Sequence, residues 1–573
     1  MTRPEHLEVV VVGSGFGGSV SAYRLAQAGR QVCVLERGRA YPPGSFPRKP
    51  HEMRTNFWDP SSGLHGLFNL WSFRGIEAVV SAGLGGGSLI YANVLIRKDE
   101  RWFVHDQSFG SGVEHWPIDR AMLDPHYDQV ERMLGATQFP HEAPGFGVAK
   151  TQALREAAAG AGLEWQLPNL AVTFADRDGQ PAISAPLPPG AYPNLHGASR
   201  LTCRLCGECD VGCNDGAKNT LDHTYLSAAF HLGAEIRTRS EVRRIAPRDG
   251  GGFVVDYVEH HEADEGRAIP AAQRPHTTVT CDRLVLAAGA IGTTNLLLRN
   301  RSAFPHLSPA LGTRFCGNGD LLGFAIPKPG LAGGRDAYRV IDSSAGPVIT
   351  SAVRVADEAD GGDGRGHYVE DAGYPYFLSW IVETRAAPST LGRLARFALR
   401  RMLARVTGDP RSDLSAEVGE LLGRARVSSA SLPLLGMGRD VPDGVMQLRR
   451  GHLDVDWTVH SSEAYFARLR GTMQALAEQL DAQFLDSPMW RFKRVITVHP
   501  LGGAPMGRHP AEGVIDASGE VFHYPGLHVV DGAAMPGPIG PNPALTIAAF
   551  ADRATEHILS SGGATARTRE EVR

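Results

Sequence analysis

Residues 9–18 read V-V-V-V-G-S-G-F-G-G, a run that few folds can accommodate. Four consecutive valines predict a strand buried on both faces, and glycines follow at the spacing G-x-G-x-x-G. Gly13 permits the tight turn after the strand, Gly15 lets the backbone approach a pyrophosphate, and Gly18 allows close helix packing. The run therefore predicts a dinucleotide-binding turn, with the positive end of the following helix directed at the phosphates.

Glu36 completes this unit. Gly29 ends the predicted helix, and the apolar run V-C-V-L at residues 32–35 predicts the next parallel strand. Glu36 follows at the tip of that strand, where a carboxylate can accept hydrogen bonds from both ribose hydroxyls. Strand, turn, helix, strand and acid in register predict dinucleotide binding, but they do not distinguish FAD from NAD.

The composition indicates a multidomain protein with no tendency to bind nucleic acid. At 573 residues the chain exceeds what a single hydrophobic core usually supports, so we expect two or more domains. Lys and Arg total 58 against 62 Asp and Glu, and the net charge of −4 argues against nucleic acid as a partner. No signal peptide and no apolar stretch of transmembrane length stand out, so we expect a cytoplasmic protein.

Three further segments indicate a deeply enclosed cofactor. Residues 81–93, S-A-G-L-G-G-G-S-L-I-Y-A-N, form a glycine-rich turn with room for a planar ring or a phosphate against bare backbone. Residues 282–298 and 524–536 each combine a buried strand with a turn of small residues, and Asp531 leaves the second strand. Turns from both ends of the chain would enclose the cofactor, which favours a flavin retained through turnover.

Three C-terminal motifs follow in order: H-P-L-G-G at 499–503, V-V-D-G at 529–532 and G-P-N-P-A-L-T-I-A-A at 540–549. On these motifs the chain resembles the glucose–methanol–choline (GMC) oxidoreductases, and within that family the bacterial cholesterol oxidases with non-covalent FAD. The resemblance implies an α/β fold. A Rossmann-like, doubly wound FAD-binding domain with a parallel sheet and helices would be joined to an α+β substrate-binding domain with a large mixed or antiparallel sheet.

The resemblance also implies discontinuous domains. The FAD-binding domain is expected to comprise residues 1–42, 78–100, 218–318 and 494–562. The substrate-binding domain is expected to comprise residues 43–77, 101–217 and 319–493. Residues 563–573 are expected to form a disordered tail.

The site residues are likewise those that the resemblance implies. Glu36 would bind the adenosine ribose, Asp531 would bind the polar chain of the flavin, and the loop 82–93 would lie beside the isoalloxazine. The family's catalytic histidine and asparagine fall on His499 and Asn542. The expected cofactor contacts are Gly13, Gly15, Gly18, Glu36, Gly85, Gly86, Gly87, Ser88, Asn93, Val242, Asp531, Gly532 and Asn542.

His499 and Asn542 both suit alcohol oxidation. The reaction removes the hydroxyl proton while a hydride leaves carbon for flavin N5. An imidazole with a near-neutral pKa can take that proton, and an amide can orient the same oxygen. Position alone leaves simpler alternatives open: His499 as a structural histidine beside a turn, and Asn542 as the N-cap of the following helix.

Four of the seven cysteines, Cys203, Cys206, Cys209 and Cys213, form C-x2-C-x2-C-x3-C. This spacing equals that of bacterial ferredoxins, whose thiolates hold iron–sulfur clusters. Asn214 replaces the usual proline, and there is no second copy of the run to share ligands. Similar segments occur in a subset of GMC proteins. Structural thiols or disulfides, an iron–sulfur cluster and zinc stay open, in that order.

The remaining stretches are expected to form the substrate domain. Cholesterol oxidases of this type carry a glutamate that moves a proton during double-bond isomerisation, and Glu383 is its best-placed candidate. Residues 389–406 predict a basic amphipathic helix, either covering the core or resting on an anionic bilayer as a peripheral contact.

These features predict an FAD-dependent oxidoreductase that takes a hydride from the CH–OH group of a bulky hydrophobic alcohol, sterol- or steroid-like. Dioxygen or another acceptor would then receive the electrons. The first alternative is a GMC dehydrogenase that passes electrons through an iron–sulfur cluster to a quinone or carrier protein, or that acts on a different alcohol or sugar. The second is a flavin-binding protein without turnover that serves as a redox-responsive interaction module.

Overall fold

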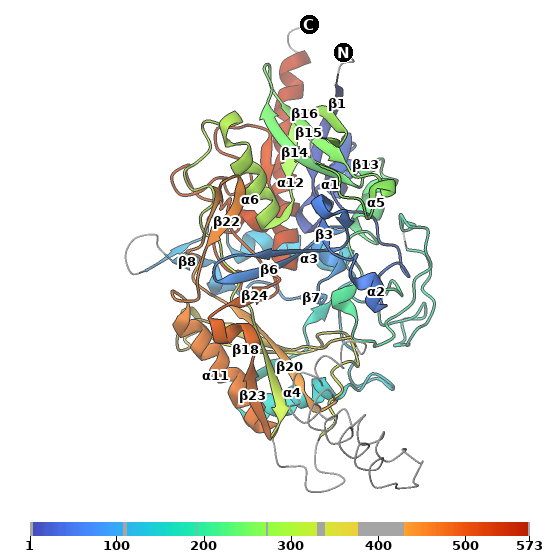
Figure 1. The fold of residues 1–573 in the computed structure, drawn as a ribbon, viewed down its shortest axis with the longest axis vertical. Coiled ribbons are helices and arrows are strands. Elements are labelled where there is room, and N and C mark those ends of the chain that lie inside the picture. Colours follow the sequence, from blue (N-terminus) through green and yellow to red (C-terminus); the bar gives the residue numbers. More distant parts are fainter. Residues whose placement is uncertain are drawn as a thin grey trace, which may run out of the picture.

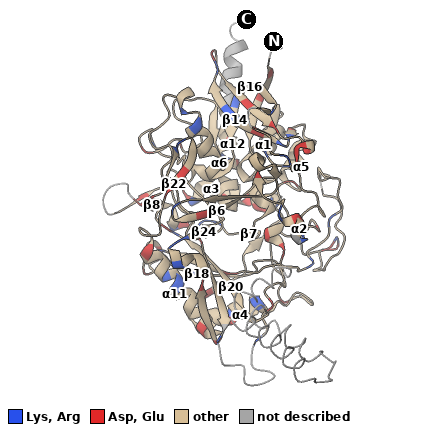
Figure 2. Cartoon of the chain, viewed as in Figure 1, with Lys and Arg blue, Asp and Glu red and all other residues tan. Residues whose placement is uncertain are grey.

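Two large sheets lie at opposite ends of the long axis, with small sheets and loops between them (Figure 1). The computed structural model describes residues 4–106, 112–190, 192–270, 273–328, 339–375 and 429–570. Both termini lie at the end of the molecule that carries the sheet with the N-terminal strand, Glu5–Val12 (Figure 1). Basic and acidic residues are interspersed over both halves of the described chain (Figure 2).

The first sheet, called here the Rossmann-like sheet, has seven strands in the order β13-β2-β1-β16-β15-β14, with β25 paired to β16. Its strands are β1 Glu5–Val12, β2 Val32–Leu35, β13 Glu235–Arg237, β14 Ser240–Pro247, β15 Phe253–Glu259, β16 His276–Leu286 and β25 Leu527–Val529. Its helices are α1 Phe16–Gln27, α5 Tyr225–His231, α6 Gly289–Arg299 and α12 Ala544–Glu570. The pairs β13–β2, β2–β1, β1–β16 and β16–β25 are parallel, which confirms the predicted α/β class.

The valine run is buried because β1 has a neighbour on each side. It pairs with β2 from Val9 to Val12 and with β16 along most of its length. α1 packs against α5 and α12, so the first and last helices of the Rossmann-like half lie side by side. Residues from both ends of the chain thereby share one hydrophobic core, as a sheet assembled from distant strands requires.

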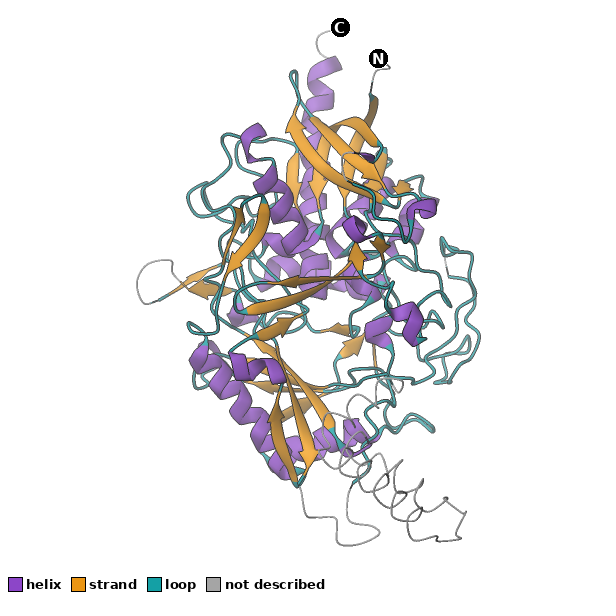
Figure 3. Cartoon of the chain, in the orientation of Figure 1, coloured by secondary structure: helices purple, strands orange, loops and turns teal. Residues whose placement is uncertain are grey.

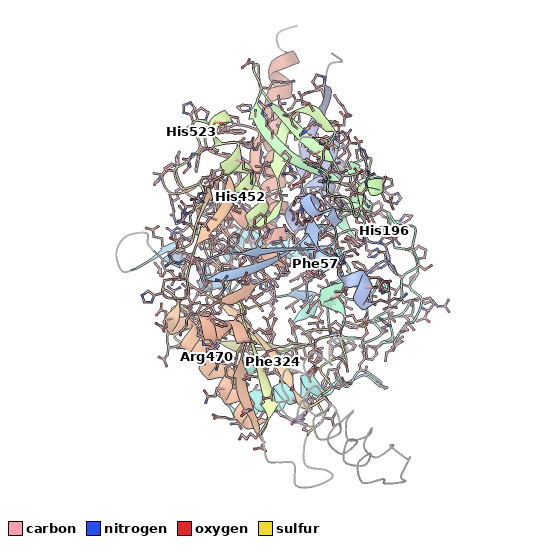
Figure 4. The ribbon with its side chains drawn as sticks, viewed as in Figure 1. Phe57, His196, Phe324, His452, Arg470 and His523 are labelled. Carbon is pink, nitrogen blue, oxygen red and sulfur yellow. The ribbon has the colours of Figure 1, made fainter. Side chains whose placement is uncertain are left out.

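The second large sheet, called here the substrate-side sheet, has the order β11-β18-β19-β20-β17-β23, and all its pairs are antiparallel. Its strands are β11 Glu164–Gln166, β17 Leu321–Pro327, β18 Ala352–Val355, β19 His367–Asp371, β20 Leu432–Gly438 and β23 Ala482–Asp486. Its helices are α4 Ala149–Gly160 and α11 Glu463–Gln479, which pack against one another (Figure 3). Phe324 on β17 and Arg470 on α11 mark this end of the molecule in Figure 4. The expected large mixed or antiparallel sheet is confirmed, and it is antiparallel.

Short elements fill the space between the two sheets. They are α2 Pro50–Met53, α3 Arg120–Met133, β3 Trp58–Asp59, β4 Leu64–His65, β5 Phe68–Ser72, β6 Ile76–Ser81, β7 Val94–Leu95, β8 Val104–Asp106, β9 Val113–His115, β10 Thr137–Gln138, β12 Asn169–Leu170, β21 Val445–Arg449, β22 His452–Asp456 and β24 Val495–Thr497. β24 pairs in parallel with β6. This pairing brings the strand before His499 beside the strand before the glycine-rich loop 81–93.

Two sequence predictions, Glu383 and the helix over 389–406, lie outside the described residues. α12 continues to Glu570 and so covers most of 563–573, for which the composition predicts disorder. Ala, Arg and Glu in this segment have high helix propensity, which explains the continuation. Among the described helices, none combines the length and the apolar character needed to cross a bilayer.

Replacing Gly18 by alanine should destabilise the protein. An added Cβ would collide with the carbonyl oxygen of Gly13, a backbone atom that cannot rotate away. We expect the free energy of unfolding to fall by about 1–3 kcal/mol, measured as a lower midpoint of chemical denaturation.

Gly471→Ala is the matched control. This exposed glycine of α11 has no atom within 4 Å of an added Cβ, and alanine has the higher helix propensity. Its midpoint should stay the same or rise. An unchanged midpoint in Gly18→Ala would contradict the close packing of helix and turn.

Candidate active site

The glycines of the first turn have the distinct surroundings that their predicted roles demand. Gly13 has φ +95°, and a Cβ there would strike the backbone of Ala287. A Cβ at Gly15, by contrast, would meet nothing within 4 Å. The turn is therefore tightly packed where the protein needs it and open beside Gly15, where a pyrophosphate would contact bare backbone.

Glu36 lies at the tip of β2 and is buried, with 5% of its surface exposed. Its Oε2 accepts from the Ser14 N–H at 3.1 Å and from Ser14 Oγ at 2.6 Å, and its Oε1 accepts from the Gly38 N–H at 2.8 Å. These three donors fix the carboxylate beside the glycine turn. Val242 comes two residues after Ser240, whose N–H donates to the Glu36 carbonyl. The Val242 side chain packs against the hydrophobic core of the Rossmann-like half.

The glycine-rich loop is tied to the same turn. The Gly85 N–H donates to Ser14 Oγ at 3.0 Å, and an added Cβ on Gly86 would lie 2.6 Å from Gly15 Cα. Ser88 Oγ donates to the Gly85 carbonyl at 2.7 Å, which closes the loop on itself. A Cβ on Gly87 would meet nothing within 4 Å, so this glycine also faces open space.

Asn93 ends this loop in an unusual state. It has φ +72°, is fully buried, and neither its Oδ1 nor its Nδ2 has a hydrogen-bond partner. Buried amides are normally paired, so an orphaned one points to a polar partner that the protein itself does not supply. The open space at Gly15 and Gly87 and the orphaned amide together fit a polar, elongated cofactor.

Asp531 joins the turn after β25 to the start of α6. Its Oδ2 accepts from the Gly289 N–H at 2.8 Å and from Thr293 Oγ1 at 2.5 Å, and its Oδ1 accepts from the Ala533 N–H at 2.8 Å. Burial raises the pKa of this carboxyl to about 6. The next residue, Gly532, accepts the Gly502 N–H at 2.9 Å, so the V-V-D-G and H-P-L-G-G motifs are hydrogen-bonded to each other.

His499 is held by a carboxylate that the sequence analysis missed. Its Nδ1 lies 2.8 Å from Oδ1 of Asp320, whose side chain is 1% exposed. Oδ2 of Asp320 accepts from Thr497 Oγ1 and from the Val498 N–H, each at 2.9 Å. An ionised carboxylate can only accept, so Nδ1 carries the hydrogen and Nε2 is left as the acceptor. The contact with Asp320 favours the tautomer that a base requires.

Asn542 does not behave as a helix cap. Its Oδ1 is buried without a hydrogen-bond partner, and its Nδ2 donates to Oε2 of Glu370 at 3.3 Å. Glu370 lies on β19, is fully buried, and has an unpartnered Oε1. Burial, and then the charges of Asp371 and Asp320, raise the pKa of this carboxyl to about 8. Glu370 therefore reaches the same site from the substrate-side sheet.

Two more buried side chains hold the loop that carries Asn542. Asn318 Oδ1 accepts from the N–H groups of Ile539 and Gly540 at 2.9 Å, and its Nδ2 donates to the carbonyls of Gly540 and Pro541 at 3.1 Å. Lys98 Nζ donates to two carbonyls of residues 538–539 at 2.9 Å. Burial lowers the pKa of Lys98 well below its usual value.

The segment C-G-N-G-D at 316–320 thus organises both candidate catalytic residues. Asn318 fixes the loop before Asn542, and Asp320 fixes His499. Reciprocal backbone hydrogen bonds between Cys316 and Leu501 attach the segment to the H-P-L-G-G motif. The signal in the sequence was the run G-N-G-D, which places Asn and Asp beside glycines, and for Glu370 it was the two adjacent acids that end the run H-Y-V-E-D.

The raised pKa of Glu370 has a consequence for stability. Between its ordinary value of 4.5 and about 8, the folded protein holds a proton that the unfolded chain has lost. The free energy of unfolding therefore decreases as pH rises through this window. Glu370→Gln removes this penalty, so the stability of the variant relative to the parent should rise from pH 4.5 to pH 8.

Chemical denaturation across this pH window measures the difference. Glu478→Gln, which alters an exposed glutamate of α11, is the control and should show a difference that does not vary in this way. Parallel stability curves for the parent and Glu370→Gln would contradict a buried, protonated carboxyl at position 370.

Comparison with known proteins places this geometry in a family. Residues 197–317 and 448–551 match family models described as GMC oxidoreductase, and residues 11–49 match one described as an NAD(P)-binding Rossmann-like domain. A cholesterol oxidase of Mycobacterium tuberculosis is 32% identical over 96% of this chain and 91% of its own length. A cholesterol oxidase of Acinetobacter baumannii is 27% identical over 96% and 94%.

A solved structure, pyridoxine 4-oxidase from Mesorbium loti, has the same fold. It superposes with a TM-score of 0.54 at 16% identity and covers 96% of this chain and 99% of its own. The glycine turn, the enclosed loop with its orphaned amide and the ordered C-terminal motifs agree with these matches. The chain belongs to the GMC oxidoreductase family and is an FAD-dependent oxidoreductase that acts on alcohols.

Proposed function

We propose that the protein oxidises the CH–OH group of a bulky hydrophobic alcohol, sterol- or steroid-like. The observation that carries this proposal is the partly buried His499 together with the buried Asp320, Asn542 and Glu370 at the junction of the two sheets. His499 and Asp320 are 179 residues apart along the chain, and Asn542 and Glu370 are 172 residues apart. The extensive similarity to two cholesterol oxidases supports the substrate class.

His499 and Asn542 divide the work on the hydroxyl group. Nε2 of His499 accepts the hydroxyl proton, while Asp320 holds the ring and stabilises the positive charge that develops on it. Asn542 orients the same oxygen through its amide, whose Oδ1 has no partner in the protein. FAD, when bound, supplies the acceptor for the hydride that leaves the carbinol carbon. Glu36, Asp531 and the loop 85–93 would hold it.

Glu370 takes the role that the sequence analysis assigned to Glu383. With a pKa of about 8, its carboxyl is largely protonated at neutral pH and can both give and take a proton. Its cross-strand neighbours Ala352 and Leu435 are apolar, which suits a hydrocarbon substrate and explains the desolvation. We propose that Glu370 moves the proton of a double-bond isomerisation that follows oxidation.

An anaerobic screen of flavin reduction against sterols, sugars and simple alcohols tests the substrate class. A 3-hydroxysteroid should bleach the flavin fastest, and His499→Gln should slow that reduction by about 10²–10⁴-fold, the usual worth of a general base. Glu370→Gln should still reduce the flavin but accumulate the unconjugated ketone. Preferential reduction by a sugar, or undiminished reduction in His499→Gln, would overturn these assignments.

Asp320→Asn tests the positioning of His499. The side-chain amide of this variant can donate a hydrogen bond to Nδ1 of His499. That contact favours the tautomer with the hydrogen on Nε2, and Nε2 can then no longer accept the hydroxyl proton. We expect the anaerobic rate of flavin reduction to fall by about 10- to 100-fold at neutral pH, with little change in the bound FAD content.

Asp486→Asn is the control, because Asp486 is ion-paired with Arg470 on the outer part of the substrate-side sheet. Its rate should match the parent. A rate for Asp320→Asn that equals that of Asp486→Asn would mean that the Asp320 carboxylate does not set the state of the imidazole.

A further inference from the structure

The four clustered cysteines surround one cavity. Cys203, Cys206, Cys209 and Cys213 all line it, together with Arg204 and Lys218. Each of the four is a free thiol, and Cys203 and Cys209 are buried. In two-cluster ferredoxins the fourth cysteine of such a run serves another cluster, which left this run without a fourth ligand. The fold removes that objection, because Cys213 faces the same cavity as the other three.

Donor groups and a cation lie near the sulfur atoms, although burial raises the pKa of Cys203, Cys206 and Cys209. The Leu205 N–H donates to Sγ of Cys203 at 3.4 Å. The backbone N–H groups of Glu208 and Val348 lower the pKa of Cys206 and Cys209, against the larger effect of burial. The positive charge of Arg204 also favours the charged form of Cys206. Peptide N–H groups and cations directed at sulfur stabilise the charge of a sulfur-ligated cluster and adjust its potential.

The spacing of the sulfur atoms argues against the other two uses of such a loop. No cysteine of the described chain is in a disulfide. Zinc with bonds of about 2.3 Å to sulfur would draw four thiolates to within about 4 Å of one another. Among the described residues, three or more His, Cys, Asp or Glu ligand atoms lie within 4.8 Å of one another at His105, Glu114 and Glu512, and this group includes no cysteine. The cysteines form a wider cage than one metal ion needs.

The cage is attached to the flavin loop through one buried lysine. Lys218, 1% exposed, donates from Nζ to the carbonyls of Leu89 and Tyr91 at 3.1 and 2.9 Å and to that of Cys209 at 2.8 Å. The short helical turns 86–89 and 209–211 also contact each other. The cysteine loop therefore lies directly behind the loop that covers the cofactor, while Cys206 and Cys213 are partly exposed.

We propose that Cys203, Cys206, Cys209 and Cys213 hold a [4Fe–4S] cluster that carries electrons from the reduced cofactor to a one-electron carrier protein. The electron-transfer part rests on the proposed function. Each alcohol oxidised to a ketone gives up two electrons and two protons. The electrons leave one at a time through the cluster and reduce two molecules of the carrier, and the protons pass to solvent.

Metal analysis of the anaerobically purified full-length protein tests the site without any assay of activity. We expect about four iron atoms and four acid-labile sulfides for each FAD, and an electron paramagnetic resonance signal after reduction with dithionite. Cys206→Ala should lose at least about nine-tenths of the iron while keeping its FAD. Cys281→Ala, which removes a buried thiol of β16 outside the loop, should keep both.

Turnover with cytochrome c, a one-electron acceptor too large to reach a buried flavin, tests the electron path. Cys206→Ala should lower this turnover at least about tenfold and leave the anaerobic reduction of flavin by the same alcohol unchanged. Absence of iron and sulfide in the parent protein, zinc in their place, or equal iron in Cys206→Ala and Cys281→Ala would overturn the cluster. A flavin that no alcohol reduces would overturn the proposed function, while the iron analysis still decides the site.

Discussion

Buried hydrogen bonds of the segment 317–320 hold the candidate active site together. Both ends of the Asn318 amide hydrogen-bond to the backbone of residues 539–541. Both carboxylate oxygens of Asp320 hydrogen-bond to residues 497–499. Such bonds matter most in the interior, because a buried polar group that loses its partner cannot recover it from water. The segment leads directly into β17, so the substrate-side sheet is anchored to the two motifs that carry His499 and Asn542. The positions of both candidate catalytic residues depend on this segment.

Desolvation gives the site its chemical character. Burial raises the pKa values of Glu370 and Asp531 and lowers that of Lys98, so three groups that are charged in water are shifted toward their neutral forms. Polar atoms of Asn93, Asn542 and Glu370 also lack partners within the protein. An enclosed region with unmet hydrogen-bonding groups is suited to hold a polar cofactor and an apolar substrate, because it excludes water while it fixes both. The free-energy cost of removing these groups from water is offset by the apolar surface buried in the large cores of the two sheets.

The loop 85–93 lies between the glycine turn after β1 and the cysteine loop. On one side it is hydrogen-bonded to Ser14 and lies against Gly15, in the region that we propose holds the cofactor. On the other side Lys218 joins it to Cys209. A buried ammonium needs acceptors for all of its hydrogens, and three carbonyl oxygens from two loops supply them. These three hydrogen bonds therefore also hold the cysteine loop at a fixed position against the loop 85–93.

The sequence alone determined the Rossmann-like unit, from its glycine spacing and apolar runs, and the family, from short ordered motifs. The second sheet was expected as mixed or antiparallel only because the family resemblance implies it. The roles of His499 and Asn542 stay predictions that the geometry supports. Asn318, Asp320 and Glu370 were not found, because their contacts are with partners 172 to 223 residues away along the chain. Only the tertiary structure decided which buried groups meet, since burial and long-range hydrogen bonds arise when distant segments pack, and no local pattern encodes them.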